Sequence, residues 1–173
     1  PSPTSDLPIQ IFGGTIDANR EKNTGVTNGL ALRNYWSSVT GLTVKNCSGE
    51  GIQPTDKGRN SNIITNTSVE MRFLDCQIRN CVGNAFHQID SGSSQVTDGF
   101  ISRLVIQGCG QGQTEEAGIL LDKAAGWLVS GAHIYSVGGP GIRALGGFGT
   151  RILGNYIEAY GQSRRAPSAG VAG

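Results

Sequence analysis

The chain has 173 residues, enough for one domain, and its 14 Lys and Arg against 13 Asp and Glu give a net charge of +1. This balance lacks the basic excess of nucleic-acid-binding proteins, and no apolar run approaches the ~18 residues that a membrane span requires. Glycine accounts for 27 residues without a three-residue period, which excludes collagen, and regularly spaced hydrophobic residues (37%) indicate a packed fold rather than disorder.

A three-residue segment with an aliphatic centre recurs along the chain. Its centres are Ile16, Val44, Ile78, Ile106, Ile134 and Ile157. A short apolar run precedes each segment, and a small residue followed by a large apolar one, such as Gly51-Ile52 or Ala85-Phe86, follows most of them. Each repeat therefore predicts three short strands separated by turns.

The spacing between successive centres varies while the pattern around them stays constant, so the insertions lie in turns. No repeat contains the apolar periodicity of a crossover helix. These features predict an all-β fold, a right-handed parallel β-helix of about six coils with three short strands each. We expect the β-helix over residues 1–160 and a flexible C-terminal segment over 161–173. Neither end shows a capping helix, so we expect part of a longer chain or an assembly such as a homotrimer.

Cysteine and tryptophan add two expectations about the interior. Cys47, Cys81 and Cys109 each follow a strand centre by three residues, which predicts a ladder of buried thiols inside the solenoid. Together with Cys76 they lack the spacing of a zinc site. Trp36 and Trp127 fit either the core or a ligand-stacking surface, and the sequence leaves this open.

One sheet of the predicted solenoid carries most of the candidate functional side chains. Along its strands Ile52, Phe86, Ile119 and Ile142 would point inward, so that their successors point outward. Those successors are Gln53, His87, Leu120 and Arg143, and the strand ends add Asp56, Asp90, Asp122 and Lys123. Long turns flank this sheet, so we expect a shallow ligand groove over it.

Two reactions fit these residue types. A β-elimination on a uronate needs a base, for which we select His87, and a cation to neutralise the carboxylate, which Arg143, Lys123 or a Ca²⁺ held by Asp56 and Asp90 would supply. A glycosidase needs two carboxylates, and Asp56 and Asp90 on adjacent strands would lie ~5 Å apart. The catalytic candidates are His87, Asp90, Asp56, Asp122 and Arg143, and the substrate-binding candidates are Gln53, Glu50, Lys123 and Glu115. The alternative for each is a solvated charge on the outside of a solenoid.

Several segments resemble the pectate-lyase superfold, which includes bacterial alginate C5-epimerases and phage tailspikes. They are GGTIDANREKNTG (Gly13–Gly25), GEGIQPTD (Gly49–Asp56), GILLDK (Gly118–Lys123) and the stretch Ile134–Gln162. The resemblance implies a parallel β-helix that handles polysaccharide. It does not extend to the epimerase catalytic residues, because Glu50 and Gln53 stand where that family has Tyr and Asp.

Two hypotheses about function follow. The first is a lyase or hydrolase that acts on an acidic polysaccharide in the groove. The second is a non-catalytic structural or carbohydrate-binding module of a virion tailspike, fibre or surface protein. Both place the protein outside the cell or on a virion surface, with no nucleic-acid or membrane partner.

Overall fold

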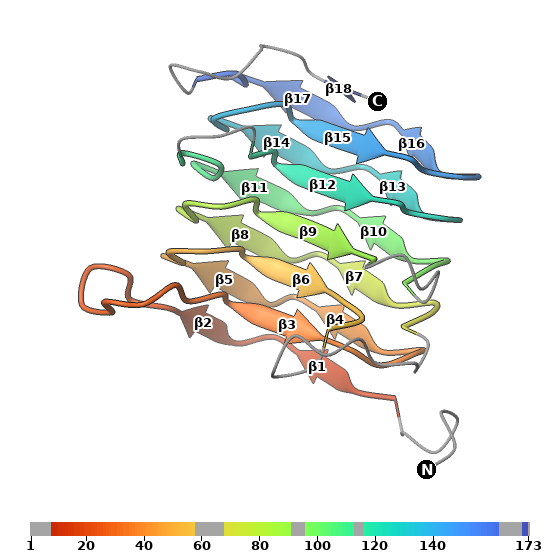
Figure 1. The fold of residues 1–173 in the computed structure, drawn as a ribbon, viewed down its shortest axis with the longest axis horizontal. Helices are drawn as coiled ribbons and strands as arrows, with labels where there is room; N and C mark the ends of the chain where they lie inside the picture. Colours follow the sequence, from red (N-terminus) through yellow and green to blue (C-terminus); the bar gives the residue numbers. More distant parts are fainter. Residues whose placement is uncertain (1–7, 58–67, 91–95, 113–115, 163–170, 173) are drawn as a thin grey trace.

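The chain winds into stacked coils, and each coil contributes one short strand to each of three parallel sheets (Figure 1). The structure, a computed structural model, describes residues 8–57, 68–90, 96–112, 116–162 and 171–172. The predicted right-handed parallel β-helix of six coils with three strands each is confirmed. No helix among the described residues is long and apolar enough to cross a membrane.

The strands of the three sheets follow one another in rotation along the chain. Sheet A consists of β1 (Gln10–Phe12), β4 (Ser38–Thr40), β7 (Arg72–Leu74), β10 (Phe100–Ser102), β13 (Leu128–Ser130) and β16 (Arg151–Leu153). Sheet B consists of β2 (Thr15–Asp17), β5 (Thr43–Lys45), β8 (Gln77–Arg79), β11 (Val105–Gln107), β14 (His133–Tyr135) and β17 (Tyr156–Glu158). Sheet C consists of β3 (Leu30–Leu32), β6 (Ile52–Pro54), β9 (Phe86–Ile89), β12 (Ile119–Asp122), β15 (Ile142–Leu145) and β18 (Val171–Ala172).

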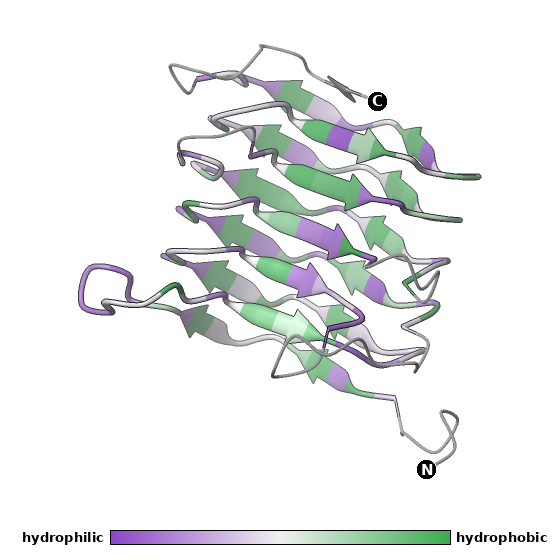
Figure 2. Cartoon of the chain, in the orientation of Figure 1, coloured by the Kyte–Doolittle hydropathy of each residue, from purple (hydrophilic) through white to green (hydrophobic). Residues whose placement is uncertain are grey.

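The interior is built from ladders of apolar side chains at equivalent places in stacked strands, a repetition that Figure 2 shows along each sheet. In sheet B, Val44 pairs with Ile78, and the register continues to Ile157 as predicted. The central members of this ladder have no exposed surface. Because each strand exposes alternate residues, one aliphatic residue per strand is enough to form a continuous core.

The corners of the coils repeat as regularly as the strands do, and they adopt left-handed backbone conformations. The corner that leads into sheet A is occupied by Trp36, Glu70, Asp98, Gly126 and Gly149, all with positive φ. Each non-glycine residue in this conformation costs about 1 kcal/mol. The geometry of the coil, rather than the intrinsic backbone preference of the residue, therefore fixes the conformation at such a corner.

The two tryptophans lie in opposite environments. Trp127 is fully buried, and its ring lies 5.9 Å from that of Phe86 in an edge-to-face arrangement. Phe86 also packs edge-to-face on Phe73, with ring centroids 4.9 Å apart. Trp36, by contrast, is 62% exposed. Only Trp127 is therefore a core residue.

Sheet C ends in a strand near the end of the described residues. Val171 and Ala172 form β18, which pairs in parallel with Ile142 and Arg143 of β15. A strand of two residues contains no period that a sequence pattern could reveal. The boundary at residue 160 stays a prediction.

The four cysteines are free and have no exposed surface, as predicted. Burial raises the pKa of the Cys76 thiol above its ordinary value, because a thiolate is poorly solvated in an apolar core. We expect no cysteine of the folded chain to react with a thiol reagent such as dithiobis-nitrobenzoate, and all four to react once a denaturant unfolds it. Rapid modification of a thiol in the native chain would contradict this burial.

Candidate functional site

The outer face of sheet C carries a row of side chains from four neighbouring strands. His87 of β9 pairs with Leu120 of β12, which pairs with Arg143 of β15, and Gln53 of β6 follows the same register on the other side. All four are half-buried, as expected of outward residues partly covered by their neighbours. The predicted outward row is therefore confirmed.

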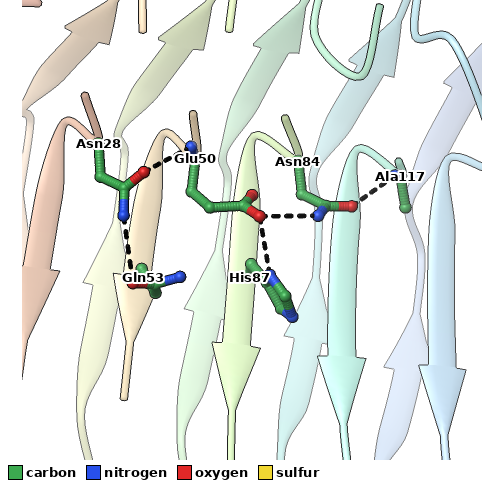
Figure 3. A network of polar contacts seen from close by, with 6 residues as sticks. All are labelled: Asn28, Glu50, Gln53, Asn84, His87 and Ala117. Atoms are coloured by element: carbon green, nitrogen blue, oxygen red, sulfur yellow. Dashed lines mark hydrogen bonds and ion pairs between the residues drawn. The ribbon is translucent and has the colours of Figure 1, made fainter. Parts of the chain in front are cut away.

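His87 forms a close pair with a carboxylate from the preceding coil. Its Nδ1 lies 3.0 Å from Oε1 of Glu50, and the two side chains are only 16% and 19% exposed (Figure 3). The same Oε1 accepts a hydrogen bond from Nδ2 of Asn84 at 3.2 Å. An ionised carboxylate oxygen can only accept hydrogen bonds, so the ring nitrogen that contacts it has to be the donor. This contact therefore assigns the proton of the imidazole to Nδ1. Nε2 of neutral His87 then carries the lone pair, and no described residue donates a hydrogen bond to it.

Glu50 is itself part of a ladder of polar side chains at the corner before sheet C (Figure 3). Oδ1 of Asn28 accepts a hydrogen bond from the backbone N–H of Glu50 at 2.9 Å, and Nδ2 of Asn28 donates to Oε1 of Gln53 at 3.3 Å. One coil further on, Oδ1 of Asn84 accepts from the N–H of Ala117 at 2.6 Å. The ladder holds the Glu50 carboxylate at a fixed position beside His87 and ties four coils together.

The second oxygen of Glu50 has an unusual environment. Oε2 is buried and accepts no hydrogen bond from the described residues. A buried acceptor without a partner costs about 1–3 kcal/mol, and such groups are rare in folded proteins. The Glu50 carboxylate is therefore held beside His87 although Oε2 loses its contact with water there.

The structure corrects the expected placement of two candidate residues. Asp56 and Asp90 are 1% and 2% exposed, so they do not lie on the open face of sheet C. The reason is that alternation ends with the strand: at the end of β6 and just after it, Pro54, Thr55 and Asp56 are all buried, and Thr55 still pairs with Ile89 of the next coil. Oδ2 of Asp90 accepts a hydrogen bond from the backbone N–H of Val96 at 3.2 Å.

The remaining candidates are spread over the same face. Asp122 is half-buried at the end of β12, one strand from Ile89 in the register, and Lys123 is exposed at the corner that follows. Arg143 lies two strands from His87, which corresponds to ~10 Å. Glu115 lies outside the described residues. Sheet C thus brings together His87, Glu50 and Gln53, while its cations lie further along the face.

A metal centre gains little support from this arrangement. Within the described ranges, no group of three or more His, Cys, Asp or Glu side chains is placed to hold a metal ion. Ca²⁺ takes 6–8 oxygen ligands, and the predicted pair Asp56 and Asp90 brings only two carboxylates.

Sequence reasoning missed Asn28 and Asn84 and gave Glu50 only a substrate-binding role. A signal was present, because each stands two positions before the first inward residue of a sheet C strand, as in Asn28-Gly29-Leu30, Glu50-Gly51-Ile52 and Asn84-Ala85-Phe86. Polar residues at one repeated place in stacked coils form a ladder. The small middle residue of each triplet marks the same place in successive coils. The polar residue before it therefore also occupies an equivalent place in each coil.

The comparisons with known proteins agree with this architecture. Residues 28–171 match the family described as "Right handed beta helix region". None of the curated proteins and none of the solved structures matches the chain significantly. The matched region includes most of the strands of sheet C and all the residues of the Glu50–His87 ladder.

Proposed function

The chain belongs to the right-handed β-helix family, and we propose that it is a polysaccharide-processing enzyme that cleaves an acidic polysaccharide over sheet C by β-elimination. The observation that carries this proposal is the Glu50–His87 pair, with Nδ1 of His87 3.0 Å from a fixed carboxylate oxygen. A carboxylate that accepts from Nδ1 leaves Nε2 as a general base and stabilises the imidazolium that forms when it takes a proton.

The reaction assigns a role to each group on the face. Nε2 of His87 removes the proton next to the uronate carboxylate, the electron pair forms a carbon–carbon double bond, and the bond to the glycosidic oxygen breaks. The leaving oxygen takes a proton from solvent. Arg143 would neutralise the uronate carboxylate, and the exposed Lys123 would contact the next sugar. Gln53, one strand from His87, is placed to donate hydrogen bonds to sugar hydroxyls.

Hydrolysis has less support from the same face. A glycosidase requires two carboxyl groups that both reach the substrate. The burial of Asp56 and Asp90 removes the predicted pair from the open surface. Elimination needs one base and one cation, for which His87 and Arg143 are available on this face, and is therefore the better match to the residues at hand.

A non-catalytic role is the second candidate, and one observation favours it. Asn28, Glu50 and Asn84 form hydrogen bonds between successive coils, so the ladder also has a structural purpose. In that role the chain would be a structural or carbohydrate-binding module of a virion tailspike, fibre or surface protein. For either role we propose a location outside the cell or on a virion surface, and assembly as a homotrimer or within a larger chain. Four free thiols favour assembly in a reducing compartment before release.

A panel of acidic polymers (polygalacturonate, alginate and hyaluronan) with neutral dextran as the control tests the proposal. We expect the full chain to release products with the ultraviolet absorbance of an unsaturated uronate from at least one acidic polymer and none from dextran. New reducing ends without that absorbance would indicate hydrolysis and contradict elimination. Binding of a polymer without any cleavage would contradict the enzyme and favour the structural module.

A further inference from the structure

The outer face of sheet A carries a row of two arginines with two apolar residues between them. Arg72 of β7, Phe100 of β10, Leu128 of β13 and Arg151 of β16 occupy the same register position in four neighbouring strands. Three strand spacings separate the arginines, which corresponds to ~14 Å. The row therefore presents two positive charges with an apolar strip between them, on a different sheet from His87.

Both arginines lack a charged partner within the described part of the chain. Arg72 lies over the Phe100 ring, with the guanidinium carbon 5.6 Å from the ring centroid, and forms no ion pair there. Arg103, at the corner after β10, behaves differently and holds Asp75 through two hydrogen bonds of 2.6 and 2.8 Å. Arg72 and Arg151 are exposed and therefore open to an anionic ligand.

Trp36 extends this row at the corner before β4. Its φ of +54° is a left-handed conformation that bulky residues rarely adopt, and its side chain is 62% exposed. Neither the backbone conformation nor the exposure of the indole stabilises the fold. Because the same left-handed corner recurs at Glu70 and Asp98, the conformation belongs to the coil, and the exposure of the large indole is the observation that points to a ligand. The neighbouring Tyr35 ring lies 5.3 Å away and braces the indole.

The surface between these side chains is hollowed. Trp36, Glu70 and Arg72 line a depression of about 250 Å³. A second depression of about 240 Å³ lies between Arg72, Phe100 and Leu128, with the hydroxyls of Ser102 and Ser130 at its edge. Because Arg72 lines both, the two depressions are neighbours along sheet A, and together they are called the channel.

We propose that this channel on sheet A binds a segment of acidic polysaccharide that lies along the axis of the β-helix. The faces of sugar rings would pack on Trp36 and on Phe100 with Leu128, since both surfaces are apolar and open. Carboxylates of the polymer would pair with Arg72 and Arg151. The unpaired charges favour this ligand over a second copy of the chain, which would bury two guanidinium groups without counter-charges on a narrow apolar strip. The proposal shares its class of ligand with the proposed function, but not its site.

Tryptophan fluorescence reports on this channel alone, because Trp36 is exposed while Trp127, the only other tryptophan, has no exposed surface. We expect polygalacturonate to protect the fluorescence of the full chain from acrylamide quenching in a saturable way, and dextran to give no protection. High salt is expected to weaken the protection, because it screens exposed charges. Acrylamide quenching that is unchanged at saturating polygalacturonate would overturn the proposal, and equal protection by dextran would overturn the acidic specificity.

Two sets of variants test the residues. Arg72→Gln with Arg151→Gln is expected to weaken the binding that protects Trp36 by about tenfold or more. Lys22→Gln with Arg79→Gln removes the same charge from elsewhere on the surface and is expected to leave it unchanged. Equal effects of the two pairs would overturn the site. A change of oligomeric state in the Arg72 and Arg151 variant would instead assign the face to a second copy of the chain.

Trp36→Gly separates binding from folding, because glycine adopts the left-handed corner without strain. We expect a thermal midpoint equal to or above that of the wild type, together with weaker polygalacturonate binding in a calorimetric titration. A lower midpoint with unchanged binding would give Trp36 a structural role and overturn its part in the proposal. His87→Ala is expected to leave the protection of Trp36 by polygalacturonate unchanged. Loss of turnover in that variant therefore tests the proposed function on sheet C and not the binding site on sheet A.

Discussion

If the proposed elimination is correct, replacement of His87 by alanine is expected to lower kcat on an acidic polymer by at least about 100-fold, the usual contribution of a general base. The reason is that Oε1 of Glu50, 3.0 Å from Nδ1 of His87, holds the imidazole ring in place, so that Nε2 would act as the base in the proposed reaction. Initial rates of unsaturated uronate release measure the effect. The circular dichroism spectrum and the thermal midpoint should stay close to those of the wild type, because the side chain is partly exposed.

The chain contains a matched control for this variant. His133 of sheet B also pairs with a carboxylate, with Nε2 3.2 Å from Oε1 of Glu158, and its ring centroid lies 4.7 Å from that of Tyr135 and 4.9 Å from that of Tyr156. His133→Ala removes the same side chain and the same type of ion pair from the other face, so turnover should be retained. If both histidine variants lost turnover equally, or if neither did, His87 would not be the base.

Strand positions were predictable because they follow from alternation within a repeat. The outward row of Gln53, His87 and Arg143 needed only the inward assignment of Ile52 and its equivalents, and the register confirms it. In a solenoid each copy of the sequence pattern corresponds to one coil, with one strand in each sheet. A single sequence therefore contains several copies of the pattern, which is enough to define the sheets. The fold was predictable for this reason.

Corner positions were not predictable by the same reasoning. Asp56 lies beyond the end of β6, where Thr55 is buried as well and the alternation has ended, while Trp36 stands in a left-handed corner and is exposed. The backbone conformation of a corner depends on the coils above and below it, and neither composition nor period records it. The hydrogen bonds among Asn28, Glu50 and Asn84 form at a corner too, and sequence reasoning therefore selected both His87 and Glu50 but not the contact between them.

Replacement of Phe86 by alanine is expected to lower the free energy of unfolding by about 3–5 kcal/mol, the usual cost of removing a buried aromatic ring. Phe86 has no exposed surface and contacts both Phe73 and Trp127 edge-to-face, so its loss leaves a cavity that these rings cannot close without leaving their own positions. Since domains are stable by only about 5–15 kcal/mol, this single change removes a large share of the total. Urea denaturation followed by circular dichroism measures it.

Phe148→Ala is the control for this change, because the same ring is 82% exposed there and its removal should alter the stability by no more than about 0.5 kcal/mol. Equal stabilities of the two variants would contradict the packed aromatic core. The effect also bears on the functional face, since Phe86 and His87 are adjacent in β9 and point to opposite sides of sheet C. Coils of a solenoid are stabilised mainly by their neighbours, so a cavity in β9 weakens the contact between the coil that holds Glu50 and the coil that holds His87. We therefore expect Phe86→Ala to reduce turnover even where most of the chain remains folded, whereas Phe148→Ala leaves both properties unchanged.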